Sequence, residues 1–462
     1  MEDIAVDPFL TSSFGTFMVA LFQGSLTVPS WQSFPSLAYG WAWTYGRQTI
    51  TAYLWVSGAT SVKHFSRYYA FLGGSLYTAR YTLWARVIRG GAALAPPDAV
   101  ISIAIDDTTM KKSGPQIEGG AYYRNGAGTA RQEYRSLWGI NLVWAIMRVP
   151  LQRWPGHHLS LPIGLELYLK AKLAGTLGVP YRSRSQLARG IVALAAQHLP
   201  NRTIRVVADG EYATKAFLRH LPKRVQVICR VLSTAKRYQV PLTPTQKRRG
   251  APRKKGDLIG SPTTLAQQPA GGHPHPQEAG ALVQSWVGLW HSVLPGQPIR
   301  LVVVRRPSHE GPPGPKGKTL FGRLKPLEAF LSTEVSCHPA AILAAYQERW
   351  AMEIDIRDGH AFYGVAQDQC RKLPHMVGAN TLRLLMAAAR TRWFIDHSER
   401  AGGVALCQWR PWYRQKVAPS QMDIAEACRE VLHEEGIFPI PRFFPALAKN
   451  RQGPDTQIPI AA

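Results

Sequence analysis

The segment 346–360 carries the residue types that could bind and cut a phosphate ester. Read as a helix, it places five polar side chains at steps of three or four residues, and therefore on one face: Tyr346, Arg349, Glu353, Arg357 and His360. A face that combines a carboxylate with cations and a phenol suits a charged ligand. A solvated helix face with charges at random is the alternative.

Two further acidic positions follow apolar stretches that predict buried strands. Residues 99–105 run into Asp106 and Asp107, and residues 204–208 run into Asp209. The carboxyl ends of strands in open α/β sheets collect ligands and chemistry. An acid at one strand end can instead cap the following helix. Two such ends together with the polar helix face indicate a site of three carboxylates.

The donor types favour a hard metal ion at such a site. Carboxylate oxygens are the preferred ligands of magnesium and manganese, and the chain has no Cys or His cluster at zinc-ligand spacing. The sequence therefore predicts Mg²⁺ or Mn²⁺ rather than zinc.

These motifs, in this order, resemble bacterial insertion-sequence transposases with an Asp-Asp-Glu (DDE) triad and a Tyr-Arg-Glu-Lys (YREK) signature. The spacing Tyr-x2-Arg-x3-Glu-x6 in 346–360 is similar to the signature, although His360 stands where the family has Lys. The segments DDTT (106–109) and ADGEY (208–212) resemble the first and second acid motifs. The resemblance covers residues 60 to 430 and implies a DDE superfamily endonuclease with an RNase H-like fold.

The resemblance assigns Asp107, Asp209 and Glu353 as catalytic residues and as ligands of two Mg²⁺ (or Mn²⁺) ions, with Asp107 bridging both. Asp107 is preferred because the family's acid directly precedes the Thr pair. Asp106 is the alternative first acid, since strand alternation lets only one of the two neighbours face the site. Phosphate contacts are expected from Tyr346, Arg349, Arg357 and His360, with a structural salt bridge as the alternative for either arginine.

The implied activity is metal-dependent cleavage at transposon ends, followed by attack of the freed 3′ hydroxyl on target DNA. A structure-specific nuclease on the same fold is one alternative. A domesticated, catalytically impaired DNA-binding protein is the other, because His at position 360 is largely neutral at pH 7 where Lys is cationic.

The charge of the chain favours a polyanionic partner. Its 462 residues include 55 Lys and Arg against 29 Asp and Glu, a formal charge of +26. Such an excess suits nucleic acid or an anionic membrane surface.

The apolar run 14–22 is too short to span a membrane, and five scattered Cys without a signal-peptide pattern favour a reducing cytoplasm. We expect double-stranded DNA as the partner, a homodimer in the synaptic complex, and a nucleoid-associated protein of the bacterial cytoplasm.

The pattern of elements predicts an α/β fold, with strands first and then alternating strands and helices. We expect a helical DNA-binding domain at 1–95, with a helix-turn-helix-like unit at 47–72 or, alternatively, a mere helical cap. The RNase H-like core, a mixed sheet flanked by helices, would occupy 96–221 and 331–398. A β-rich insertion at 222–330 would separate its parts, and a C-terminal segment would follow at 399–462.

A basic cluster lies in a Pro- and Gly-rich loop at about 241–280 that we expect to be disordered. Phosphate neutralisation by such a cluster adds DNA affinity, and a merely solvated basic run is the alternative. Its members are Lys247, Arg248, Arg249, Arg253, Lys254 and Lys255.

Overall fold

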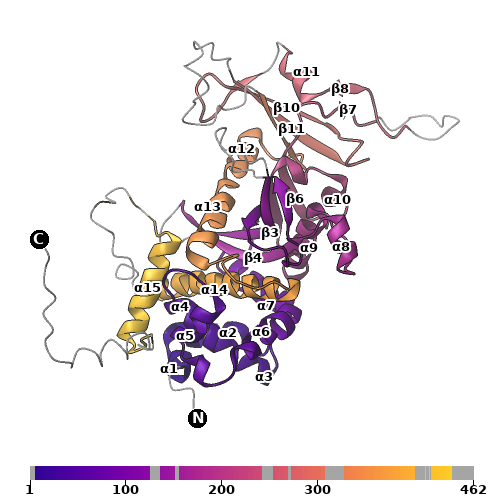
Figure 1. Cartoon of the computed structure of the whole chain (residues 1–462). Coiled ribbons are helices and arrows are strands. Elements are labelled where there is room, and N and C mark those ends of the chain that lie inside the picture. Colours follow the sequence, from indigo (N-terminus) through magenta and orange to yellow (C-terminus); the bar gives the residue numbers. More distant parts are fainter. Residues whose placement is uncertain are drawn as a thin grey trace, which may run out of the picture. The chain divides into compact units, whose positions relative to one another are not determined.

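The computed structural model describes residues 6–124, 136–150, 156–241, 253–268, 272–306, 327–400, 412, 416 and 418–439, in two compact units (Figure 1). We call Trp84–Gly359 the sheet unit, and Met1–Leu83 with His360–Ala462 the helical unit. The division falls inside helix α7 (Tyr77–Ala92).

Twelve strands occur among the described residues, and all belong to one sheet in the sheet unit. The order is β2-β3-β1-β5-β6-β12-β11-β10-β7-β8, with β4 paired to β3 and β9 to β10. The strands are β1 (Ile101–Lys111), β2 (Ala121–Arg124), β3 (Ser136–Pro150), β4 (His158–Tyr168), β5 (Ile204–Ala208), β6 (Val225–Arg230), β7 (Arg237–Tyr238), β8 (Leu258–Gly260), β9 (His273–Pro274), β10 (Leu282–Leu289), β11 (Pro298–Arg305) and β12 (Leu327–Ser332).

The centre of the sheet brings the first two acidic motifs to the same edge. Strand β1 is antiparallel to β3 and parallel to β5, and β5 is parallel to β6. The last register pair of β1 and β5 is Ile105 with Ala208, so Asp106 and Asp209 follow on neighbouring strands. This confirms the predicted α/β class, a mixed sheet flanked by helices with the strand arrangement of an RNase H-like core.

The prediction that the first strand stops at the acids was wrong. Strand β1 continues to Lys111, because β3 supplies pairing partners along its whole second half, including Trp144 for Asp106 and Val143 for Asp107. The two acids therefore lie within a strand rather than in a turn, and their side chains point to opposite faces of the sheet.

The predicted β-rich insertion between the second and third acids is confirmed as an extension of the same sheet. Strand β12 pairs with β6, and β11 and β10 add on beyond it. Within this insertion the sequence predicts strands at 299–304 and 319–324. The first is β11, and the second lies outside the described residues. Strands β4 and β10 were not predicted.

Helices of the sheet unit are α8 (Ala171–Thr176), α9 (Arg184–His198), α10 (Lys215–Leu218), α11 (Pro262–Ala266), α12 (Pro339–Gln347) and α13 (Trp350–Asp358). The sequence predicts a helix at 184–197, which is α9 in the structure. It begins with a capping box in which Ser183 and Gln186 satisfy each other's backbone N–H groups.

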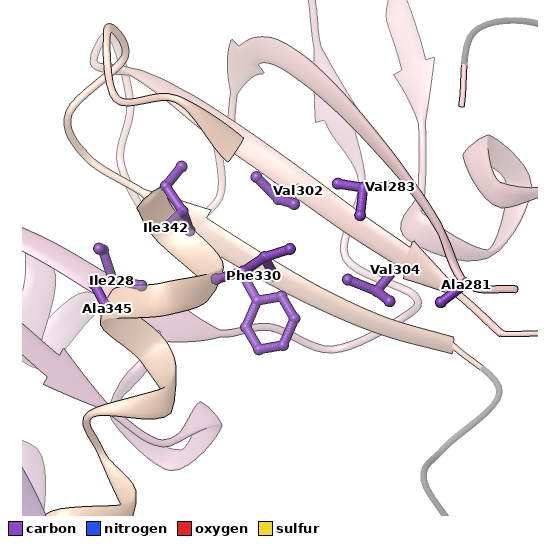
Figure 2. Close-up of a cluster of buried hydrophobic side chains, with 9 residues drawn as sticks. Ile228, Ala281, Val283, Val302, Val304, Phe330, Ile342 and Ala345 are labelled. Atoms are coloured by element: carbon purple, nitrogen blue, oxygen red, sulfur yellow. The ribbon is translucent and has the colours of Figure 1, made fainter. Parts of the chain in front are cut away.

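Helix α12 is anchored to the sheet by a cluster of buried apolar side chains (Figure 2). Ile342 and Ala345 on α12 pack with Val302 on β11 and Phe330 on β12. Removing such side chains from water stabilises the folded state by roughly 25 cal/mol per Å² of apolar surface. The helix that leads into segment 346–360 is thereby held against β11 and β12.

The helical unit contains α1 (Val6–Thr11), α2 (Ser13–Phe22), α3 (Val28–Trp31), α4 (Phe34–Trp43), α5 (Ile50–Val56), α6 (Phe65–Phe71), α14 (Leu373–Arg400) and α15 (Gln421–Glu434). Two short helices around a tight break were expected at 47–72. They are α5 and α6, with Gly58 in the left-handed region (φ 69°). No helix of the described residues is both long and apolar enough to cross a membrane.

Candidate active site

Asp106 and Glu353 share one arginine. Arg349 Nη1 lies 2.9 Å from Asp106 Oδ2, and Arg349 Nη2 donates to Glu353 Oε1. Arg349 is only partly exposed, at 17% of its side chain. A guanidinium held between two carboxylates forms charge-assisted bonds to both, so β1 and α13 are fixed to each other at this point.

The second acidic motif lies in the same electrostatic environment. Burial raises the pKa of Asp106 to about 7, the charges of Asp107 and Asp209 add to that rise, and Arg349 opposes it. Burial likewise raises the pKa of Tyr346 to about 12, and Asp209 contributes. Asp209 itself accepts from the Gly210 N–H at 2.6 Å and begins the short 3₁₀ turn Gly210–Tyr212.

Asp107 belongs to a different set of contacts. Its Oδ2 accepts from Asn141 Nδ2 at 2.9 Å and lies 3.1 Å from Arg184 Nε, and its Oδ1 accepts from Tyr212 OH at 3.3 Å. Asn141 is buried, and Arg184 Nε also donates to Asn141 Oδ1 at 3.0 Å. These bonds occupy both carboxylate oxygens of Asp107, on the face of β1 opposite to Asp106.

The expectation of one continuous helix across 346–360 was wrong. Helix α12 ends at Gln347 and α13 begins at Trp350, with Arg349 as its N-cap residue. The N–H groups of Glu348, Arg349 and Ala351 each bond three residues back, which tightens the chain between the helices. Tyr346 therefore belongs to α12, where its ring packs 4.6 Å from that of Phe330.

The other expected phosphate contacts are exposed. Arg357 bonds to its neighbour Asp358 through Nε (3.1 Å) and Nη2 (2.9 Å), and 70% of its side chain is exposed. His360 is exposed at the start of the helical unit, in the π-helical segment Gly359–Tyr363. Of the basic loop, Arg253, Lys254 and Lys255 are exposed, and the cluster 247–249 lies outside the described residues.

The residue types at this site suit a divalent metal ion. Asp106, Asp209 and Glu353 offer carboxylate oxygens, the ligands that Mg²⁺ prefers. In the part of the chain that the structure describes, no group of three or more His, Cys, Asp or Glu is arranged to hold a metal ion. Arg349 is instead bonded to two of the three acids.

Sequence reasoning did not single out four residues of this region. Asn141, Arg184 and Tyr212 bind Asp107, and Trp350, next to Arg349, is 61% exposed. Arg184 is the first residue of α9, and this position gave no sign that its partner is Asp107. Trp350 could have been identified from the sequence, because it is an aromatic residue within a segment that carries many polar side chains.

Two known protein families match this chain. The chain matches the family described as DDE superfamily endonuclease over residues 48–278, and the transposase DDE domain over residues 182–388. Together the two matched ranges include Asp106, Asp209 and Glu353. A search of curated proteins found no match.

Proposed function

The chain belongs to the DDE superfamily of endonucleases, and on this premise we propose that it is a transposase. It cuts DNA at the ends of a mobile element and joins the freed 3′ hydroxyl to target DNA. The observation that carries the proposal is the linkage of Asp106 and Glu353 through Arg349. The charge of Asp209 also acts on this site, because it raises the pKa of Asp106.

We propose Asp106, Asp209 and Glu353 as the catalytic triad. Sequence reasoning preferred Asp107, but the contacts favour the alternative. Both oxygens of Asp107 are bonded to Asn141, Arg184 and Tyr212, whereas Asp106 faces Arg349. Asp106 accepts two hydrogen bonds, one from the Asp107 N–H and one from Arg349, whereas Asp107 has three polar contacts. More lone pairs of Asp106 therefore remain for a metal ion. Asp107 acts as a positioning residue that fixes the orientation of β1.

The triad would hold two Mg²⁺ or Mn²⁺ ions, which supply an activated water and stabilise charge on the leaving oxygen. The fit rests on the oxygen donors of three carboxylates, which suit a hard divalent cation. The pKa of Asp106 is raised to about 7 because its carboxyl is buried and lies near the charges of Asp107 and Asp209. Such an environment favours binding of a cation.

Arg349 acts as the phosphate clamp beside the triad. Its planar guanidinium can exchange a carboxylate for a phosphate oxygen while keeping two parallel hydrogen bonds. Tyr346 packs against Phe330 and limits where the Arg349 guanidinium, 5.9 Å from its ring, can move. Arg357, Lys254 and Lys255 are exposed cations that add contacts to the DNA backbone, in keeping with a chain of charge +26.

The chemistry also bears on assembly and place of action. Transposon excision processes two ends together, and each chain carries one triad. We therefore propose a homodimer on paired DNA ends, acting on the nucleoid in the bacterial cytoplasm.

The test is Mg²⁺-dependent cleavage and strand transfer on a DNA fragment that carries the terminal repeats flanking the gene. Asp106→Asn, Asp209→Asn and Glu353→Gln should each lower cleavage by at least about a thousand-fold while leaving DNA affinity within a few-fold. Asp107→Asn is the matched control, because it changes the neighbouring carboxylate and should retain measurable cleavage.

Other outcomes separate the alternatives. Cleavage without preference for the repeats would indicate a nuclease, and binding without cleavage would indicate an inactive DNA-binding protein. If Asp106→Asn cuts at the normal rate while Asp107→Asn does not, Asp107 is the first acid.

A further inference from the structure

A pocket of about 440 Å³ opens in the helical unit along one face of α15. Its polar lining comes from the end of α4 and the residues after it, from α14 and from α15, and we call it the α15 pocket: Thr44, Gln48, Arg390, Glu426, Arg429 and Glu430. Pockets of 300–1,000 Å³ are typical of small-molecule sites.

Arg390 in this pocket is a buried cation whose guanidinium is only partly satisfied. Only 3% of the residue is exposed, and its guanidinium lies 4.5 Å from the ring of Trp41. Two of its nitrogens, Nε and Nη2, are buried and have no hydrogen-bond partner within the part of the chain that the structure describes. Burial lowers its pKa to about 10, so the side chain is still charged at neutral pH. An unpaired buried charge is costly, and an anion that enters the pocket offsets that cost.

A second guanidinium lines the same pocket. Arg429 donates from Nε to the Ala42 carbonyl at 2.8 Å and stacks 4.3 Å from the ring of Tyr45. The charge of Arg429 is close enough to lower the pKa of Arg390. Glu426 and Glu430 also line the pocket. The unsatisfied Nε and Nη2 of Arg390, beside a second guanidinium, are the groups that favour an anion.

One hydrogen-bond acceptor of the pocket is also unsatisfied among the described residues. Gln48 is 6% exposed, its Nε2 donates to the Thr44 carbonyl at 2.8 Å, and its Oε1 is buried without a partner. The ligand should therefore carry a hydroxyl or amino group as well as its negative charge. Phe362 and Tyr45 provide aromatic surface in the same lining.

We propose that the α15 pocket binds a phosphate monoester or diester of nucleotide size, with Arg390 and Arg429 as its cations and Gln48 as an acceptor. Arginine suits phosphate because its fork of N–H groups matches two phosphate oxygens. The phosphate comes from a free nucleotide or from a DNA strand, and both present the same group.

The experiment measures the Tm of the full chain, and the affinity by calorimetry, at constant ionic strength set with chloride. The probes are deoxyadenosine monophosphate, inorganic phosphate and deoxyadenosine. We expect the monophosphate to raise Tm most, phosphate to raise it less, and the nucleoside without phosphate to leave it unchanged. No rise with either phosphate-bearing probe would overturn the proposal.

Three variants locate the site. Arg390→Met should raise Tm in phosphate-free buffer, because it replaces an unpaired buried charge by an apolar chain of similar size, and should abolish the response to phosphate. Arg429→Met should abolish the response without that rise, and carries the test if the Arg390 variant does not fold. Arg392→Met is the control, since Arg392 on the same helix pairs with Asp396 outside the pocket. An equal loss in the control variant would contradict the assignment.

The source of the phosphate follows from competition. If the monophosphate weakens binding of a DNA duplex to the wild-type chain but not to Arg429→Met, the pocket takes a phosphate of DNA. If duplex affinity is unchanged in both, the pocket takes a free nucleotide. Cleavage is not measured, so failure of the catalytic assignment does not affect this outcome.

Discussion

Arg349 Nη1 lies 2.9 Å from Asp106 Oδ2, although the two residues are 243 positions apart in the chain. The other terminal nitrogen of Arg349 bonds to Glu353. One side chain thus connects the strand that carries the first acidic motif with the helix that carries the last, which makes Arg349 the most informative residue for mutation.

Replacing Arg349 by Lys should lower single-turnover cleavage by on the order of 10- to 100-fold, with little change in DNA affinity. Lysine keeps the charge but cannot bond two oxygens in a fixed plane, so phosphate orientation is lost. Arg357→Lys is the control, because Arg357 bonds only to Asp358 among the acids described here and is mostly exposed. Equal losses in the two variants would contradict a special role for Arg349.

The raised pKa of Asp106 predicts a pH-dependent stability of the metal-free protein. The folded protein holds this proton with a pKa of about 7, against 3.8 for the ordinary carboxyl, so the Asp106 contribution to the free energy of unfolding falls as pH rises between these values. The side chain at this position in the Asp106→Asn variant cannot ionise, so the variant does not lose this stability as pH rises. The Tm of the variant minus that of the wild type, in a chelator, should therefore increase from pH 4 to pH 8. If this Tm difference is constant with pH, the pKa of Asp106 is not raised in the folded protein.

Exposed Trp350 should contribute to DNA binding, because it lies next to Arg349 and 61% of it is exposed. Stacking of a base on an aromatic side chain is worth about 1–3 kcal/mol, so Trp350→Ala should weaken binding of an element end by about 5- to 100-fold. Trp350→Phe should keep most of the affinity. Tyr122→Ala, which removes another exposed aromatic from the sheet unit, is the control in an anisotropy titration.

The buried pair of Arg383 and Asp368 should govern the stability of the helical unit. Arg383 Nη1 lies 3.4 Å from Asp368 Oδ2, its Nη2 donates to the Gln48 carbonyl at 2.6 Å, and neither side chain of the pair is exposed. Arg383→Met removes the guanidinium from the buried Asp368 carboxylate, which still accepts from the Cys370 N–H and from Asn380 Nδ2. The variant should lower the free energy of unfolding by about 3–5 kcal/mol. Arg392→Met, which removes the partly exposed pair with Asp396, should lower the free energy of unfolding by less than about 1 kcal/mol. Urea titration of both variants measures the two values.

Strands with continuous apolar runs were predictable, and the face that each acid takes was not. Strand β5 has the bounds expected from residues 204–208, because four of its five residues are apolar and buried, with Arg205 as the exception. Alternation shows that Asp106 and Asp107 diverge, but only the tertiary positions of Arg349 and Asn141 decide which of them faces Glu353.

The break between α12 and α13 escaped prediction for a similar reason. Residues 346–351 contain neither Gly nor Pro, and all are compatible with helix. Anchoring of α12 by the cluster around Phe330 and pairing of Arg349 with β1 set the two helices independently. The predicted domain boundaries stay predictions, and the α15 pocket combines residues from four distant stretches that no local pattern connects.

Arg383 donating to the Gln48 carbonyl is one of several bonds that join the first 83 residues to those after 359. During synthesis the amino-terminal helices leave the ribosome long before α14 exists. Until then Trp41 Nε1 lacks the Tyr363 carbonyl as its acceptor, and Tyr53 OH lacks its donor Arg383. The contiguous stretch 84–359 does not depend on a segment made so much later. A gene truncated after Glu353 would therefore encode every acid of the proposed triad together with an amino-terminal segment that is prone to aggregate.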